Sequence, residues 1–215
     1  MKLIALPGVY APQDDTALLQ YALHRETLRP RAAVLDVGTG TGALALAAAS
    51  RGACVTAVDI SHRAVWTARL NALLARTPVC VLHGDLTAPV AERTFDLILI
   101  NPPYVPGPGA PPRRGPARAW EAGRDGRSVL DRICRDVPPL LRRGGVLLVV
   151  HSDLSSVATT LRCMRAAGLS AEVIERRWVA LGPVLRARRA WLREKGMLGG
   201  EGEKEELVVI RAERT

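Results

Sequence analysis

The stretch Phe-Asp-Leu-Ile-Leu-Ile-Asn-Pro-Pro-Tyr, residues 95–104, joins an apolar strand to a rigid pair of prolines. Proline has a fixed φ and no backbone N–H, so the strand is expected to end at Asn101. The Asn101 side-chain carbonyl and the Pro102 main-chain carbonyl can both accept hydrogen bonds from one planar NH2 group, and Tyr104 can stack on it. The stretch therefore predicts a pocket for an amide or an exocyclic amine, although it can also be only a rigid turn.

An amide nitrogen is a poor nucleophile because its lone pair is delocalised. Two carbonyl acceptors can hold the nitrogen as it pyramidalises toward an electrophile, and they stabilise the positive charge that develops on it. No strong general base is needed, because the nitrogen loses its proton easily once it carries the new group. The expected catalytic residues are Asn101, Pro102 and Tyr104.

A glycine-rich turn follows the first expected strand. Residues 32–37 are mostly apolar and lead into Gly-Thr-Gly-Thr-Gly (residues 38–42) and an alanine-rich helix pattern. Strand, turn and helix in this order form the first unit of a nucleotide-binding sheet. Asp36 would repel a diphosphate but not a cationic amino acid moiety. This favours S-adenosyl-L-methionine over NAD, although the glycines alone are a weak signal.

Acidic residues also follow the next two expected strands, at residues 54–58 and 79–83. Asp59 can bind both hydroxyls of a ribose. Asp85 can accept a hydrogen bond from an adenine amino group, while Leu86 donates its main-chain N–H and packs on the ring. The alternatives are a helix N-cap for Asp59 and an Asx turn for Asp85.

The expected strand ends converge. Ligands of open parallel sheets bind at the carboxyl ends of the strands. The first four strands deliver Asp36, Asp59, Asp85 and Asn101 to those ends. These side chains are therefore expected at one edge of the sheet.

Two segments are expected to flank this edge. Residues 1–30 form an N-terminal arm and helix, in which Asp14, Asp15 or Thr16 can cap the helix or the arm can lie over a ligand. Residues 105–119 are rich in Pro, Gly and Arg, which predicts a flexible loop beside the site or a plain linker.

The remaining apolar patterns complete an α/β fold. Ser61 is the expected cap of the helix at 63–75, and the connection between the last two strands is short enough to make them antiparallel. The other expected elements are helices at 129–141, closed by Gly144 and Gly145, at 155–167 and at 185–195, strands at 146–150, 171–178 and 206–211, and a Gly/Glu-rich turn at 199–203.

Length and composition limit the classes of protein to which this chain can belong. The 215 residues suffice for one α/β domain over residues 1–215, and no apolar run reaches the roughly 18 residues of a membrane span. We therefore expect a cytoplasmic protein without membrane contact. The net charge of +9 can reflect a basic face for RNA or an acidic partner, or only an arginine-rich composition. The cysteines lie far apart, which predicts reduced core residues and no metal site.

Together these motifs resemble class I S-adenosylmethionine-dependent methyltransferases and, among them, the short single-domain branch of the HemK-like N5-glutamine methyltransferases. The resemblance covers nearly the whole chain and implies a Rossmann-like fold with a seven-stranded, mostly parallel sheet, an antiparallel last strand and helices on both faces. It rests on Val9-Tyr10-x-Pro12-x-x-Asp15-Thr16-x-Leu18-Leu19, on Asp36-Val37-Gly38-Thr39-Gly40-Thr41-Gly42, on Asn101-Pro102-Pro103-Tyr104-Val105 and on Trp120-x-x-Gly123-x-x-Gly126.

The resemblance implies roles for individual residues. The acceptor amide would lie against Asn101, Pro102, Pro103 and Tyr104. The cofactor S-adenosyl-L-methionine would be held by Thr16, Asp36, Gly38, Gly40, Asp59, Asp85, Leu86 and Asn101. The implied reaction is methylation of the glutamine in the Gly-Gly-Gln loop of a peptide-chain release factor.

This sequence also differs from the family pattern. This chain lacks the N-terminal helical domain with which the usual bacterial enzyme docks the factor, and Ala122 replaces a glycine of the Trp-x-Gly-Gly pattern. The short branch often works with a small zinc-binding activator subunit, and some of its members accept lysine.

The sequence also allows other functions. The same chemistry serves N6-adenine methylation of RNA or DNA, because the adenine amine is also a planar NH2 group. A DNA enzyme would need a target-recognition domain, for which the chain has little room. The remaining alternatives are a cofactor-binding interaction protein without catalysis, which intact Asn101 and Tyr104 disfavour, and an NAD-dependent oxidoreductase, which Asp36 disfavours.

Overall fold

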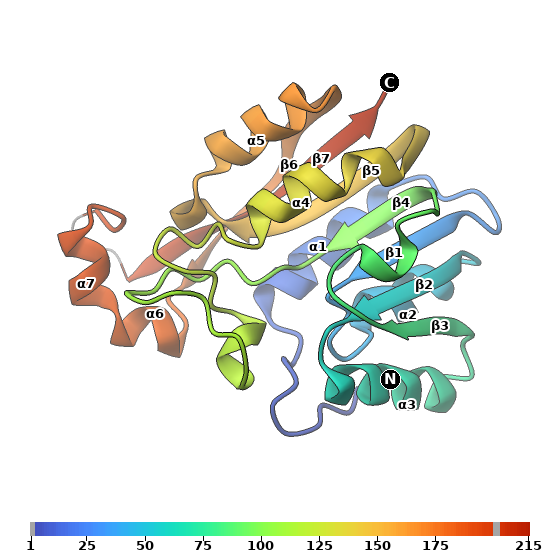
Figure 1. Ribbon diagram of the computed structural model, residues 1–215, viewed down its shortest axis with the longest axis horizontal. Coiled ribbons are helices and arrows are strands. Elements are labelled where there is room, and N and C mark those ends of the chain that lie inside the picture. The colour runs from blue at the N-terminus through green and yellow to red at the C-terminus, as the bar shows by residue number, and fades with distance from the viewer. Residues whose placement is uncertain (1–2, 200–202) are drawn as a thin grey trace.

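Parallel strands at the centre of the sheet bring their carboxyl ends to one edge. The computed structural model describes residues 3–199 and 203–215, and Figure 1 shows them as one twisted sheet covered by helices. The strands are β1 (Ala33–Val37), β2 (Cys54–Asp59), β3 (Val79–His83), β4 (Phe95–Ile100), β5 (Leu141–Ser152), β6 (Leu169–Ala180) and β7 (Lys204–Arg214).

The strand order is β3-β2-β1-β4-β5-β7-β6 in a seven-stranded sheet. Strands β1 to β5 pair in parallel, whereas β7 lies antiparallel to both β5 and β6. The order reverses between β1 and β4, which is where open sheets of this kind bind ligands. The expected mostly parallel sheet with an antiparallel last strand is confirmed.

Helices cover both faces of the sheet. In Figure 1, α4 and α5 lie in front of it, whereas α1 and α2 lie behind it. The helices are α1 (Asp14–Arg25), α2 (Ala43–Ala49), α3 (His62–Leu74), α4 (Leu130–Asp136), α5 (Val157–Ala166), α6 (Pro183–Ala187) and α7 (Arg189–Glu194). Short 3₁₀ turns occupy Ala88–Val90, Pro116–Ala119, Pro138–Leu140 and Asp153–Ser155. None of these helices is long and apolar enough to cross a membrane.

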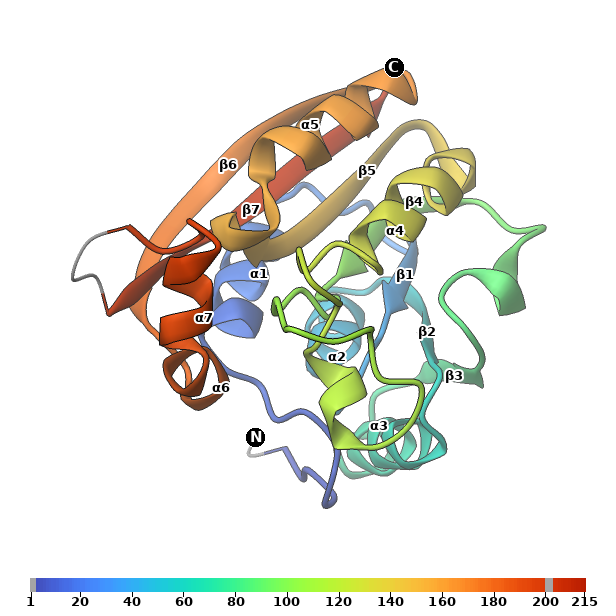
Figure 2. The same cartoon turned by 60° about the vertical axis from the view of Figure 1, so that its left-hand side comes forward.

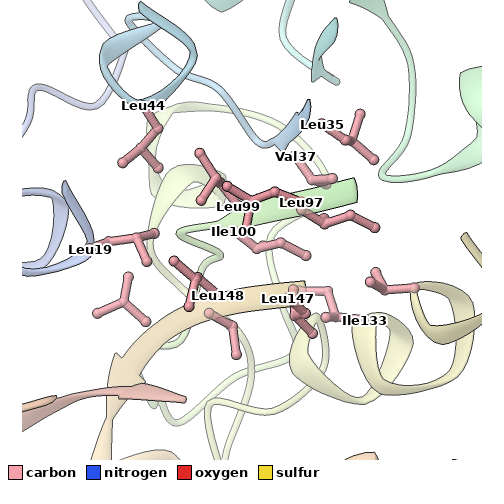
Figure 3. Packing of buried hydrophobic residues seen from close by; sticks show 14 of the residues in the cluster. Leu19, Leu35, Val37, Leu44, Leu97, Leu99, Ile100, Ile133, Leu147 and Leu148 are labelled. Atoms are coloured by element: carbon pink, nitrogen blue, oxygen red, sulfur yellow. The ribbon is translucent and has the colours of Figure 1, made fainter. Parts of the chain in front are cut away.

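Strands β4 and β5 form the centre of the hydrophobic core. Figure 3 shows Leu19 of α1, Leu44 of α2 and Ile133 of α4 packed around them. Because helices cover both faces, the apolar runs of these strands are nearly continuous instead of alternating with polar residues. This packing fixes the position of the β4 end, where the chain turns out of the sheet at Asn101.

Two sequence-based expectations for the segment before β5 are wrong. Helix α4 ends at Asp136, not near residue 141, because Pro138 and Pro139 supply no N–H for a helix. Gly144 and Gly145 lie inside β5 and close no helix. The pairing of β4 with β5 shifts register here, and a Cβ on Gly145 would lie 3.0 Å from the Phe95 carbonyl oxygen. The glycine therefore permits a β-bulge.

Other expectations fared differently. The Ser61 side chain accepts a hydrogen bond from the Ala64 N–H and caps α3, as predicted. The single basic helix expected at 185–195 is instead two short helices, α6 and α7. Residues 200–202 of the expected Gly/Glu-rich turn lie outside the described residues.

The core packing predicts that substitution of two different leucines by alanine will have very different effects on stability. Leu148 of β5 is fully buried, and Leu148→Ala should lower the free energy of unfolding by about 3 kcal/mol because it removes apolar contacts and leaves a cavity. Leu73 of α3 is 74% exposed, and Leu73→Ala should cost less than about 0.5 kcal/mol. Urea unfolding of both variants measures this, and similar losses would contradict the described core.

Candidate active site

The glycine turn between β1 and α2 brings backbone close to a large cavity. Gly38 and Gly40 have φ values of +74° and +55°, which residues with side chains rarely adopt. The Gly38 N–H donates to the Val58 carbonyl at 2.8 Å, and the Gly40 N–H donates to Asp59 Oδ2 at 2.9 Å. These bonds tie the turn to the end of β2, so its backbone forms a fixed wall.

Asp36 lies beneath this turn and supports it from inside the protein. Its side chain is fully buried, and its Oδ2 accepts hydrogen bonds from the Thr39 hydroxyl at 2.6 Å and the Ala45 N–H at 3.1 Å. The second carboxyl oxygen, Oδ1, has no partner among the described residues. Asp36 thus connects the turn to the first residues of α2.

A cavity of about 1070 Å³ opens at the carboxyl ends of β1 to β4. Residues 110–116 of the loop after β4 and the arm before α1 both contribute to its wall, and Figure 2 shows these two segments near α3. The structure places Asp36, Pro102 and Tyr104 outside this wall. The cavity brings together Thr16, Gly38, Gly40, Asp59, Asp85, Leu86, Asn101 and Pro103, all of them expected site residues.

Two acidic residues occupy different parts of this wall. Asp59 is held by the N–H groups of Gly40 and, at 2.8 Å, of Ser61, and burial raises its pKa. Asp85 is more exposed and pairs with Arg132 of α4 at 2.9 Å. Exposed ion pairs contribute at most about 1 kcal/mol, so Asp85 can exchange Arg132 for another donor at little cost.

The Asp15 carboxylate joins the N-terminal arm to the residues after β4. Its Oδ2 accepts hydrogen bonds from the hydroxyl groups of Tyr10 at 3.0 Å and Tyr104 at 3.2 Å. Its Oδ1 accepts from the Thr16 N–H at 2.5 Å and from the Thr16 hydroxyl at 3.2 Å. Helix α1 begins at Asp14 with Gln13 as N-cap and no side-chain cap, so the expected capping by Asp14, Asp15 or Thr16 is wrong.

Thr16 in turn orients Asn101. The Asn101 Nδ2 group donates to Thr16 Oγ1 at 3.2 Å, and the Thr16 hydroxyl is itself directed to Asp15. The Asn101 amide therefore presents its Oδ1 as a free acceptor. Neither this oxygen nor the Pro102 carbonyl oxygen accepts a hydrogen bond from any residue that the structure describes.

The Tyr104 side chain is buried, and it lines a second cavity but not the first. Burial and the nearby Asp15 charge raise the pKa of its hydroxyl, which stays protonated as a donor. Its main-chain carbonyl accepts from the Ser155 hydroxyl at 2.6 Å, and a side chain on Gly126 would overlap both of these groups. The corner after β4 is therefore rigid.

This second cavity, of about 490 Å³, lies beside this corner and against the N-terminal arm. It shares Gly8, Val9, Tyr10 and Pro116 with the first cavity. Tyr104, Trp120 and Glu205 line it further. The second cavity therefore adjoins the corner formed by residues 101–104, the Asn101 corner, through Tyr104.

Sequence reasoning missed the roles of Asp15, Arg132 and Glu205. The contacts of Asp15 with Tyr104 and of Arg132 with Asp85 join residues that are far apart in sequence, and no local spacing reveals them. Glu205 carries a weak signal, because alternation along β7 places it on the same face as the buried Leu207 and Val209.

Comparisons with known proteins identify the family to which the chain is related. A family model described as a methyltransferase small domain matches residues 1–112. A candidate protein N5-glutamine methyltransferase of Methanocaldococcus jannaschii is 34% identical over 178 residues, which cover 82% of this chain and 88% of that protein. A release factor glutamine methyltransferase of Mycolicibacterium smegmatis is 40% identical over 71% of this chain, and the match covers 57% of that longer protein.

A solved structure supports the fold. The E. cuniculi Mtq2–Trm112 complex, described as responsible for methylation of the translation termination factor eRF1, contains a chain that superposes with a TM-score of 0.70 at 23% identity. The superposition covers 97% of this chain and 99% of that one. On the evidence of the family model and of the relative that is 34% identical, the chain belongs to the methyltransferase small domain family.

Proposed function

We propose that this protein transfers a methyl group from S-adenosyl-L-methionine to the side-chain amide nitrogen of a glutamine in a protein substrate. The observation that carries the proposal is the fixed Asn101 amide. Its Nδ2 is bound to Thr16, and its Oδ1 lies unpaired at the wall of the large cavity. The carbonyl of the next residue, Pro102, is also unpaired among the described residues. Two such acceptors match the two hydrogens of a primary amide.

The first cavity fits the proposed cofactor. Gly38 and Gly40 allow close backbone approach, and Asp59 offers carboxylate oxygens at the end of β2. Asp36 lies outside the cavity wall and acts on the cofactor site only by holding the glycine turn in place. When bound, S-adenosyl-L-methionine would supply an electrophilic methyl group.

The residues of this chain would then activate the acceptor by position alone. Asn101 Oδ1 and the Pro102 carbonyl would accept both N–H hydrogens, which holds the amide in place and stabilises positive charge on its nitrogen. Pro102 and Pro103 keep the two acceptors rigid, because their φ angles are fixed. No residue needs to act as a strong base.

We further propose a translation release factor as the acceptor protein and the cytoplasm as the location. The relatives named as release factor glutamine methyltransferases support the release factor as the acceptor. A small activator subunit, zinc-binding in the short branch that the sequence resembles, stays a prediction. The solved complex with Trm112 supports a partner of that kind.

Two variants separate acceptor chemistry from cofactor binding. Asn101→Ala should lower kcat about 100-fold or more and leave the Kd for S-adenosyl-L-homocysteine nearly unchanged, because the amide acceptor acts mainly in the transition state. Asp59→Ala should instead raise that Kd about 10-fold or more, because it removes a charged acceptor. Calorimetric titration and single-turnover methyl transfer measure both quantities. Full activity of Asn101→Ala would contradict the proposed acceptor site.

Burial of Asp36 predicts an unusual pH dependence of stability. Burial raises the pKa of this carboxyl to about 7, so the folded protein binds its proton more tightly than the unfolded chain does. The free energy of unfolding should therefore fall by more than ~1 kcal/mol between pH 5 and pH 8, since each pKa unit corresponds to about 1.4 kcal/mol. Asp36→Asn should reduce this fall. Urea unfolding of the unaltered protein and of Asp36→Asn at several pH values measures this fall. A free energy of unfolding that rises between pH 5 and pH 8 in both proteins would contradict the raised pKa of Asp36.

A further inference from the structure

Glu205 of β7 is a buried carboxyl group that the proposed reaction does not use. Its side chain lies in the wall of the second cavity, and the residue is 8% exposed. Its Oε2 has no hydrogen-bond partner among the described residues. A buried carboxyl oxygen without a partner is costly, and such an oxygen in a cavity wall indicates a missing donor.

The second cavity is acidic. Asp14, Asp15 and Glu205 line it, whereas its lining includes no Lys, Arg or His among the residues that the structure describes. The other titratable groups in the wall are the hydroxyls of Tyr10 and Tyr104, and both donate to Asp15. Asp15 is therefore already supplied with donors, whereas Glu205 Oε2 is the buried carboxyl oxygen in this wall that has no donor among the described residues.

The neighbours of Glu205 explain its protonation. Burial raises the pKa of Glu205 to about 7, a hydrogen bond with the Ser152 side chain opposes this rise, and the nearby Asp15 charge adds to it. On the adjacent strand β6, the lining residues Val179 and Ala180 carry no charge. A cation that enters the cavity would hold Glu205 in its ionised form, because an opposite charge at short distance favours ionisation.

We propose that the second cavity binds a positively charged side chain of the acceptor segment, next to the residue that is methylated, and that the Glu205 carboxylate pairs with it. The proposal rests on the proposed function, because the cavity reaches the Asn101 corner through Tyr104 and the shared residue Tyr10. A volume of about 490 Å³ has room for one long side chain and the backbone beside it. An acidic side chain at this position would be repelled by Asp14, Asp15 and Glu205.

A pair of small probes tests this charge preference. N-acetyl-lysine methylamide and N-acetyl-norleucine methylamide have side chains of similar length, and only the first is charged. Titrations at pH 8, followed by NMR, should show the lysine probe binding about 10-fold or more tightly than the norleucine probe. At pH 6 most of Glu205 is protonated, so the affinity for the lysine probe should fall about 10-fold.

Two matched variants assign the effect to Glu205. Glu205→Gln keeps the shape of the side chain and should remove both the preference for lysine and its pH dependence. Glu203→Gln alters an exposed residue that pairs with Arg189 at 2.9 Å, and it should leave both unchanged. If Glu205→Gln does not fold, the pH dependence of the unaltered protein decides the question alone.

Equal binding of the two probes, or unchanged lysine affinity in a folded Glu205→Gln variant, would overturn the inference. A separate titration with S-adenosyl-L-homocysteine distinguishes it from the proposed function. Failure to bind that compound would contradict the proposed methyl donor, whereas the probe series reports only on the second cavity.

Discussion

The hydrogen bonds of the Asp15 carboxylate are the constraint on which the site depends. They connect Tyr10 of the arm, Thr16 of α1 and Tyr104 of the corner after β4. Thr16 in turn accepts a hydrogen bond from the Asn101 side-chain amide and so fixes its orientation. A terminal amide has two orientations that differ only in which atom faces the cavity, and this chain of bonds selects the orientation with the oxygen free. The arm therefore helps to orient Asn101, the residue that follows β4.

Burial gives three carboxyl groups three different tasks. Asp36 is sealed beneath the glycine turn and shapes it, Asp59 is fixed at the rim of the first cavity by two N–H groups, and Glu205 lies in the wall of the second cavity with an unpaired oxygen. The two cavities meet at the N-terminal arm. The methyl donor is proposed for the first cavity, whose wall includes Asn101, and the charged side chain of the acceptor segment for the second cavity, whose wall includes Tyr104.

The sequence predicted those parts of the fold that follow from local chemistry. Apolar runs marked the buried strands, and the parallel order brought Asp59, Asp85 and Asn101 to one cavity because strand ends in such a sheet share an edge. The error before β5 has a different origin: Gly144 and Gly145 are typical of a helix end, and only the register shift against β4 shows that they form a bulge. Asp15 and Glu205 could not be assigned beforehand, because their environment depends on residues that are distant in sequence.

The most direct test of the account is to locate the methyl group after reaction. The protein is incubated with methyl-labelled S-adenosyl-L-methionine and a purified release factor, with nuclease-treated and untreated cell extracts alongside, and the labelled products are fragmented by mass spectrometry. The account predicts label on the side-chain amide nitrogen of a glutamine, unaffected by nuclease. Label on an adenine amine that nuclease removes, or on a protein atom other than that nitrogen, would contradict it.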